Sequence, residues 1–214
     1  MKVSVSRLHF PVTTLGPGQR VGLWLQGCSL RCPGCISVDT WESGRGLVPV
    51  EAVRARFSQL APSSAGLTVS GGEPLDQPEA LTALLQHWRS VSKASVLLFT
   101  GREWEDAEGW LSANAGLVDC VIAGRFRSDL PQTLALRGSD NQELRILSDL
   151  GEEFRAYERV LTRGDRRLDV MFDEEGDAWL AGIPARGELG RLRRLLAAQG
   201  HKSHTSDVRG EIAA

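Results

Sequence analysis

The sequence predicts an α/β protein built on a partial (β/α) barrel, with a C-terminal extension made of a hairpin and a helix. Short apolar segments typical of strands alternate with segments whose apolar residues recur at helical spacing, which predicts a parallel sheet flanked by helices. Glycines follow the strand segments, as expected at the carboxyl edge of such a sheet. The chain has 214 residues. Because a complete eightfold barrel needs about 250 residues, we expect a partial one.

The first elements are an N-terminal hairpin, starting at residues 3–10, and the main strand at 21–25 that it leads into. A helix is expected after Pro49, where apolar residues recur as far as Leu60. The rest of the core is expected as a strand at 66–70, a helix at 78–91, a strand at 95–99, a helix at 104–111, and strands at 117–123 and 144–147.

The chain divides into three parts. We expect residues 1–150 to form the core that carries the functional site, residues 151–200 to form an extension, and residues 201–214 to form a flexible tail. In the extension, the apolar segments 168–172 and 178–183 predict a hairpin, and leucines at helical spacing predict a helix after it. The tail is polar and has no periodicity.

The composition excludes several classes of protein. Hydrophobic residues make up 42% and charged residues 24% of the chain, as in soluble globular proteins. The net charge of −2 gives no sign of a nucleic-acid or anionic-membrane partner. No apolar run approaches the roughly 18 residues of a membrane span, and the alternation of polar and apolar residues at 1–11 leads us to expect no signal peptide. We therefore expect a cytoplasmic protein, whose thiols stay reduced.

The most informative segment contains Cys28, Cys32 and Cys35 in a C-x3-C-x2-C spacing, directly after the strand at 21–25. Thiolates are soft ligands that favour iron–sulfur clusters, zinc or copper(I). A closed zinc site or a saturated four-iron cluster takes four ligands, so three thiolates leave one position open. Zinc with a distant fourth ligand and a disulfide with a spare thiol are the alternatives. The absence of a nearby fourth ligand and of a secretory signal favours the cluster.

A second motif, Gly71-Gly72-Glu73-Pro74, follows the strand at 66–70. Two glycines at a strand end usually form a tight turn, but they also let the backbone approach a ligand. Either Glu73 or exposed carbonyl groups could then pair with an ammonium group. The fourth cysteine, Cys120, lies in the apolar segment V-D-C-V-I, where we expect it to act as a small hydrophobic residue.

The C-x3-C-x2-C spacing resembles the signature of the radical S-adenosylmethionine (SAM) enzymes. In that family three cysteines hold a [4Fe–4S] cluster, and SAM chelates the unique iron through its amino and carboxylate groups. C-P-G-C at 32–35 and T-W at 40–41 resemble more narrowly the activating proteins of glycyl radical enzymes, above all the activators of anaerobic ribonucleotide reductase. Two positions differ from the family pattern. Most radical SAM enzymes carry an aromatic residue where Gly34 stands, although the reductase activators also carry Gly there. The reductase activators commonly carry Asn at the position of Ser37.

The resemblance covers about residues 15–150 and implies a set of SAM contacts. In the family, G-G-E-P binds the amino group of SAM, and the segment at 100–101 resembles W-T-G. G-R-F at 124–126 and R-G-S-D-N-Q at 137–142 resemble further signatures, the later of which lies near SAM. Arg137 could pair with a carboxylate, and Asn141 and Gln142 could bind ribose or adenine. The implied SAM-binding residues are Ser37, Gly71, Gly72, Glu73, Pro74, Thr100, Gly101, Arg137, Asn141 and Gln142.

The resemblance implies an oxidoreductase. An external one-electron reductant such as flavodoxin or ferredoxin reduces the cluster, SAM is cleaved to methionine and a 5′-deoxyadenosyl radical, and the radical takes the Cα hydrogen of a glycine in a partner enzyme. No side chain is needed as a general acid or base, because the cofactor supplies the reactive species. Two alternatives stay open. One is a radical SAM enzyme that modifies a small molecule or peptide, and the other is a non-catalytic iron–sulfur or zinc module.

Overall fold

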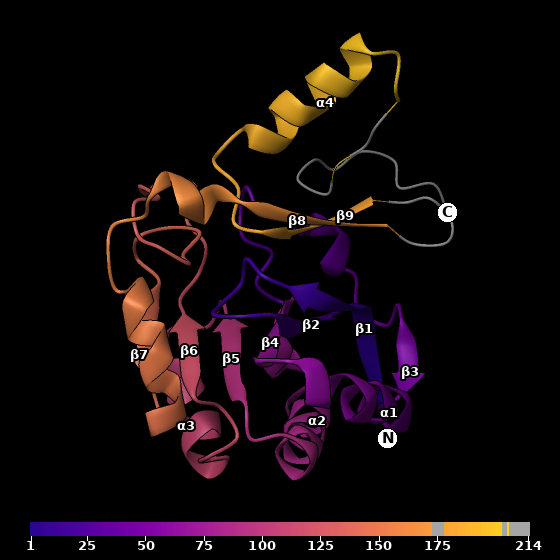
Figure 1. Cartoon of the computed structure of the whole chain (residues 1–214), viewed down its shortest axis with the longest axis vertical. Helices are drawn as coiled ribbons and strands as arrows, with labels where there is room; N and C mark the ends of the chain where they lie inside the picture. The colour runs from indigo at the N-terminus through magenta and orange to yellow at the C-terminus, as the bar shows by residue number, and fades with distance from the viewer. Residues whose placement is uncertain (173–177, 203–204, 206–214) are drawn as a thin grey trace.

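A seven-stranded mixed sheet forms the centre of the protein, seen here in a computed structural model that describes residues 1–172, 178–202 and 205. The strands follow the order β3-β1-β2-β4-β5-β6-β7, so that β3 and β7 are the two edges (Figure 1). The strands are β1 (Lys2–Val12), β2 (Arg20–Leu25), β3 (Leu47–Pro49), β4 (Gly66–Gly71), β5 (Ser95–Thr100), β6 (Cys120–Ala123) and β7 (Glu143–Ile146), and the helices of the core are α1 (Val50–Leu60), α2 (Pro78–Val91) and α3 (Trp104–Ala113).

The prediction of a parallel sheet is right for the four central strands, since β2, β4, β5 and β6 run parallel. The expected N-terminal hairpin is also confirmed, because β1 pairs antiparallel with β2. The last core strand differs from the expected pattern: β7 runs antiparallel to β6. No helix forms between residues 124 and 142, so the chain lacks the crossover that usually returns a strand in the parallel direction.

The three core helices pack against one face of the sheet. Strand side chains such as Leu23 and Val69 point into this layer, where they meet the apolar stripe of α2. The stripe is the one that the spacing predicts, and its Trp88 is completely buried. Trp88 contacts Phe57 of α1 edge-on, with 5.4 Å between the ring centres. Because full burial of one large apolar side chain stabilises a fold by about 1.5–3 kcal/mol, this layer holds the sheet in place.

The opposite face is covered by irregular segments rather than by long helices. The 3-10 segment η4 (Asp149–Tyr157) places the buried Phe154 against Leu97, Cys120 and Ile122 of the sheet. Cys120 is therefore a small buried hydrophobic residue, as expected. Burial raises the pKa of its thiol to about 12.

A buried arginine holds the amino-terminal ends of three parallel strands together. Arg20, the first residue of β2, donates to Thr68 Oγ1 of β4 at 2.8 Å and to Ser95 Oγ of β5 at 3.0 Å. Two further bonds reach the carbonyl groups of Leu67 and Ser95. Burial lowers the pKa of Arg20 to about 10. Since this network fixes one end of the strands, the loops at the carboxyl ends start from a rigid frame.

The predicted extension is confirmed as a hairpin followed by a helix. It consists of a short 3-10 turn η5 (Arg163–Arg166), then β8 (Leu168–Phe172) paired antiparallel with β9 (Ala178–Gly182), and finally α4 (Glu188–Ala198). The hairpin lies above β1, β2 and β4, and α4 stands beyond it (Figure 1). Residues 173–177, which join the two strands, and most of the expected tail lie outside the described residues. None of the helices in the described parts has the length and apolar character needed to cross a membrane.

Hydrogen bonds, apolar packing and the contact of Arg7 with Trp179 attach the hairpin to the core. Asp169 of β8 accepts four hydrogen bonds from the backbone and side chains of Thr13 and Thr14, which follow β1. On the same face, Met171 and Ala181 pack against a cluster of core side chains formed by Val12, Leu15 and Trp24. The hairpin therefore has a fixed position above the sheet.

Candidate functional site

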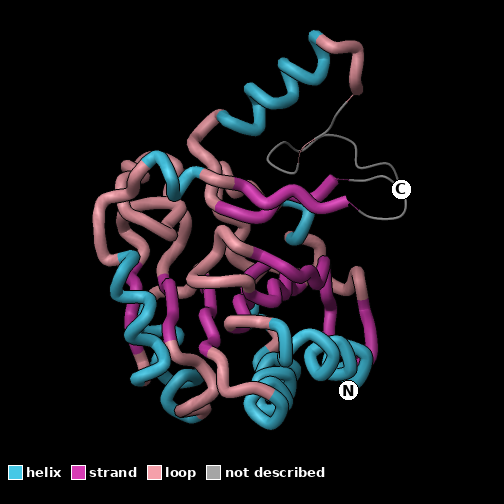
Figure 2. The backbone as a smooth tube through the Cα atoms, viewed as in Figure 1, coloured by secondary structure: helices cyan, strands magenta, loops and turns pink. Residues whose placement is uncertain are grey.

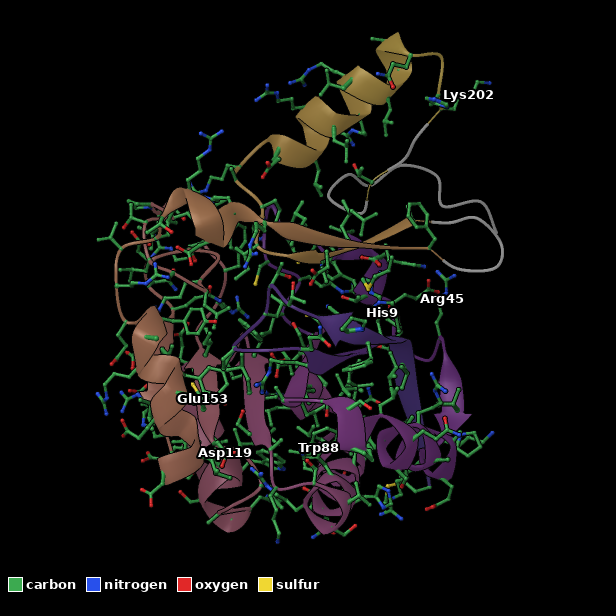
Figure 3. The ribbon with its side chains drawn as sticks, in the orientation of Figure 1. His9, Arg45, Trp88, Asp119, Glu153 and Lys202 are labelled. Atoms are coloured by element: carbon green, nitrogen blue, oxygen red, sulfur yellow. The ribbon has the colours of Figure 1, made fainter. Side chains whose placement is uncertain are left out.

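A cavity of about 1710 Å³ lies at the carboxyl ends of β2, β4 and β5. Loop residues line most of it, and residues of the hairpin and of α4 line its outer side. Figure 2 shows the hairpin and α4 beyond the loops that follow the core strands. Arg45 from the core and Lys202, which follows α4, both line this cavity from opposite sides (Figure 3). The sequence-predicted residues that line it are Cys28, Cys32, Cys35, Ser37, Gly71, Gly72, Glu73, Thr100, Gly101 and Gln142.

The three predicted metal ligands lie on one compact loop after β2. Cys28 and Cys32 each expose 9% of their surface, and Cys35 is partly buried. The loop is closed by backbone hydrogen bonds, including one of 3.1 Å from Cys35 N to the carbonyl of Cys32. Gly34 has a φ of +76°, and a Cβ there would lie 3.0 Å from Ser128. The backbone therefore explains glycine at a position where the wider family carries an aromatic residue.

Nitrogen donors surround two of the sulfur atoms. The backbone N–H of Phe126 donates to Cys32, while the backbone N–H of Ser37, at 3.4 Å, and the side chain of Trp41 donate to Cys35. Burial raises the pKa of both thiols, and these hydrogen bonds oppose the increase because they favour the thiolate. Phe126 and Trp41 belong to motifs singled out in the sequence, although their contact with sulfur could not be predicted from it.

The donor set fits an iron–sulfur cluster in kind and number. All three thiols line one cavity, whereas Cys120 lies in β6 and does not line it. Across the described residues, no three Cys, His, Asp or Glu side chains are gathered closely enough to hold a metal ion, so the thiols share the cavity without meeting at one centre. The cavity thus offers three soft ligands, as a cluster with one open iron requires.

The double-glycine turn packs directly against the cysteine loop. Gly72 N donates to Leu25 O at 2.8 Å, and Glu73 N donates to Gly27 O at 2.9 Å. A Cβ at position 72 would lie only 2.0 Å from the same Gly27 oxygen. Gly71 has a φ of +112°, which also favours glycine. The structure therefore brings the two predicted motifs together, although more than 30 residues separate them in the sequence.

Glu73 connects this turn to the turn after β5. Its carboxylate is completely buried and accepts hydrogen bonds from Leu75 N at 2.9 Å, Thr100 Oγ1 at 2.7 Å and Gly101 N at 2.8 Å. Burial raises the pKa of Glu73, and the three hydrogen bonds oppose this increase. Because internal donors already use both oxygens, Glu73 positions two loops. Of the two expectations for an ammonium ligand, the geometry favours the backbone carbonyl groups.

The 137–142 segment is held together by its own side chains. Gln142 accepts a hydrogen bond from Gly138 N at 2.8 Å and donates to Gly124 O at 3.0 Å. Asn141 donates to Arg125 O at 2.8 Å. Arg137 donates to three backbone carbonyl groups, which take the place of the carboxylate that we expected. Of the predicted residues here, only Gln142 lines the cavity.

Pro74, Arg137 and Asn141 are the three predicted cofactor residues that do not line the cavity. Pro74 begins the 3-10 turn η3 (Pro74–Asp76) and is buried. Asn141 holds the loop that contains Phe126, which donates to Cys32, and Arg137 joins its own loop to the carbonyl group of Tyr157. In this structure, these residues therefore position neighbouring groups of the site.

Sequence reasoning missed two groups that organise the site. Asp76 accepts hydrogen bonds from the backbone and hydroxyl of Ser29 in the cysteine loop and from Arg102 after β5, at 2.7–3.0 Å. Arg7 of β1 pairs with Asp39 at 2.9 Å and lies 4.4 Å from the ring centre of Trp179. An aspartate two residues after G-G-E-P was the signal in the sequence for the first group. The second joins three distant segments, and no local pattern indicates it.

Comparison with known proteins gives a consistent result. The model of the 4Fe-4S single cluster domain family matches residues 14–145. The anaerobic ribonucleoside-triphosphate reductase-activating protein of Enterobacteria phage T4 is 34% identical over 134 residues, which cover 60% of this chain and 85% of that protein. The protein of the same name from Escherichia coli K12 is 27% identical over 143 residues, which cover 63% of this chain and 93% of that protein. The pyruvate formate-lyase-activating enzyme of Clostridium pasteurianum is 40% identical over 76 residues, which cover 33% of this chain and 32% of that enzyme.

Proposed function

The chain belongs to the 4Fe-4S single cluster domain family, and on this premise we propose that it is a radical SAM enzyme that activates a glycyl radical enzyme of the anaerobic ribonucleotide reductase type. When bound, the cluster and SAM supply a 5′-deoxyadenosyl radical, which takes the Cα hydrogen of a glycine in the partner enzyme. The activating proteins of phage T4 and Escherichia coli cover most of the core, which supports this assignment over other radical SAM reactions.

One observation carries the proposal. Three thiols of the cysteine loop and the two glycine-containing turns after β4 and β5 line the same cavity. We assign the cluster to Cys28, Cys32 and Cys35. We assign SAM to the surrounding backbone and polar groups, of which Glu73, Pro74, Arg137 and Asn141 act by positioning. The assigned residues are Ser37, Gly71, Gly72, Glu73, Pro74, Thr100, Gly101, Arg137, Asn141 and Gln142.

The size of the cavity supports a large substrate. Sites for small molecules usually measure about 300–1,000 Å³, whereas this cavity measures about 1710 Å³. A cluster and SAM would leave room for a segment of a protein. The chain's own residues orient this segment and keep water away from the reacting atoms, and no side chain acts as an acid or base.

The proposal also covers the domain organisation, the cellular location and the electron donor of the enzyme. We assign residues 1–150 to a catalytic core of partial-barrel type, because helices cover one face of its sheet and the cavity opens at the carboxyl ends of the strands. Residues 151–200 form the extension and 201–214 the tail. A cytoplasmic location suits free thiols, and flavodoxin or ferredoxin would supply the electron.

Anaerobic reconstitution tests the proposal. After iron and sulfide are counted, SAM and dithionite are added, and 5′-deoxyadenosine is measured by chromatography. We then expect a glycyl radical signal by electron paramagnetic resonance when the anaerobic ribonucleotide reductase of the same organism is present. A bound cluster without SAM cleavage would identify an electron carrier. Cleavage without a glycyl signal would favour a small-molecule or peptide substrate.

A further inference from the structure

The cavity continues past the hairpin into a second region that the extension builds. Met171 and Ala181 of the hairpin face the core, so their neighbours Val170 and Leu180 lie on the opposite face, because side chains alternate along a strand. Val170 and Leu180 nevertheless line the same cavity, and Val170 is 55% exposed. The cavity therefore extends around both faces of the hairpin.

The apolar side of α4 forms the other wall of this region. Leu189, Leu192 and Leu196 recur at helical spacing and line the cavity. Leu195 of the same helix does not line it and is 55% exposed. We call this region the outer groove, formed by Val170, Leu180, Leu189, Leu192 and Leu196. It presents an apolar surface that is continuous with the cavity of the three thiols.

The charges on the extension's side of the cavity have one sign. The charged residues there, within the described part of the chain, are Arg186, Arg193 and Lys202. On the core side, Arg7 is paired with Asp39, and Arg45 with Glu42. The outer groove thus combines an apolar floor with a cationic rim, which complements an apolar segment flanked by carboxylates.

The position of the groove indicates what it serves. The family match ends at residue 145, whereas every residue of the groove lies between 170 and 196. The groove is therefore an addition to the part that holds the predicted cofactor residues. Because one cavity joins it to the thiols, a chain bound in the groove has a direct path to the reacting position.

We propose that the outer groove docks the segment of the partner enzyme that adjoins its reactive glycine. Apolar side chains of that segment lie between the hairpin and α4, and its carboxylates face the cationic rim. This inference rests on the proposed function and specifies how the partner is recognised. A few buried residues carry most of the energy of such interfaces, and burying an unpaired charge is costly, so a single charge placed in the groove weakens docking strongly.

Leu192→Asp tests this inference, with Leu195→Asp as the matched control on the same helix. Both variants are reconstituted, and their thermal unfolding is compared with that of the wild type. Dithionite serves as the reductant, so that docking of an electron-transfer protein does not enter the assay. Two rates are measured: 5′-deoxyadenosine formation without a partner, and glycyl radical formation at increasing concentrations of the anaerobic ribonucleotide reductase.

For Leu192→Asp we expect at least a tenfold higher KM for the reductase, with unchanged kcat and unchanged partner-free SAM cleavage. Leu195→Asp should behave as the wild type. Lys202→Glu should also raise the KM, and this increase should be smaller at high salt because screening weakens the charge effect.

Three results would overturn the inference. Equal KM values for the two aspartate variants would show that the groove does not contact the reductase. A loss of partner-free cleavage in Leu192→Asp would show that the groove supports the cofactor site. A defect seen only when flavodoxin replaces dithionite would assign the groove to the reductant. Failure of the wild type to cleave SAM would instead refute the proposed function itself.

Discussion

Replacing Gly72 with alanine should force apart the two loops that carry the predicted cluster and SAM contacts. The new Cβ would lie 2.0 Å from Gly27 O, 2.6 Å from Gly27 C and 3.0 Å from Thr40 O, all of which are backbone atoms. Cβ contacts below 3.0 Å are essentially absent from real structures. The turn must therefore move away from the cysteine loop by about 1 Å, because no flexible side chain can yield.

The cost of this movement has two parts. The 2.9 Å hydrogen bond from Glu73 N to Gly27 O is lost or stretched, at about 0.5–1.5 kcal/mol. Inserting a methyl group into a packed site costs about 1–3 kcal/mol more. Together, the two parts should lower the free energy of unfolding by about 1.5–4.5 kcal/mol. A misplacement of about 1 Å near reacting groups can lower activity by about 100-fold, so SAM cleavage should fall by a similar factor.

Gly109→Ala is the matched control, because a Cβ at this position in α3 meets nothing within 4 Å. It should raise the free energy of unfolding by about 0.5–1 kcal/mol, since alanine favours helix. Urea unfolding gives the two free energies, and chromatography of 5′-deoxyadenosine gives the activity. If Gly72→Ala binds its full iron content and cleaves SAM as fast as Gly109→Ala, the close approach of the two loops is not needed and the reasoning is wrong.

Three further changes test other parts of the structure. Cys28→Ala should abolish SAM cleavage and lower the iron bound after reconstitution, whereas Cys120→Ala should keep both; equal iron loss in the two variants would contradict the assignment of ligands. Glu73→Gln and Thr100→Val should each lower the free energy of unfolding by about 1–2 kcal/mol. The double variant should cost less than their sum, because the two residues share one hydrogen bond, and strict additivity in urea unfolding would show no coupling. Asp169→Ala removes four hydrogen bonds and should speed hydrogen exchange in β8 and β9, but not in β4; unchanged exchange would refute this attachment. The hydrogen bonds from Thr13 and Thr14 outweigh the effect of burial and lower the pKa of Asp169. The stability that Asp169 contributes to the folded protein should therefore be fully present above about pH 4 and be lost as the pH falls through the lowered pKa.

Local patterns predicted the elements well, because each pattern reports which side of an element is buried. The apolar stripe of α2 and the apolar segment of β4 gave both elements close to their observed bounds. The direction of β7 could not be predicted in the same way, because it depends on the path of residues 124–142. That path is fixed by contacts such as Gln142 with Gly124, which join residues far apart in the sequence.

The site could be predicted in part for a similar reason. The cysteines and glycines carry their chemistry in their spacing, and the strand order places both motifs at one edge of the sheet. The roles of Glu73 and Arg137 depend on which donors and acceptors surround them. Their side chains are used by neighbouring loops, whereas residue type alone suggested contact with a ligand. The sequence did not predict that the hairpin and α4 line the outer side of the cavity. These elements are far from the cysteine and glycine motifs in the sequence, and no local pattern indicates that they lie above them.

The apolar contact beneath the hairpin also bears on how this family diversifies. Leu15 and Trp24 belong to the core, yet they are buried in one cluster with Met171 and Ala181 of the extension. A family member without the extension would leave these two side chains bare, and soluble proteins rarely tolerate large exposed apolar patches. Such a protein must carry smaller or polar residues at these positions, or hide them against another chain. Gain of the extension and hydrophobicity at positions 15 and 24 should therefore have been inherited together.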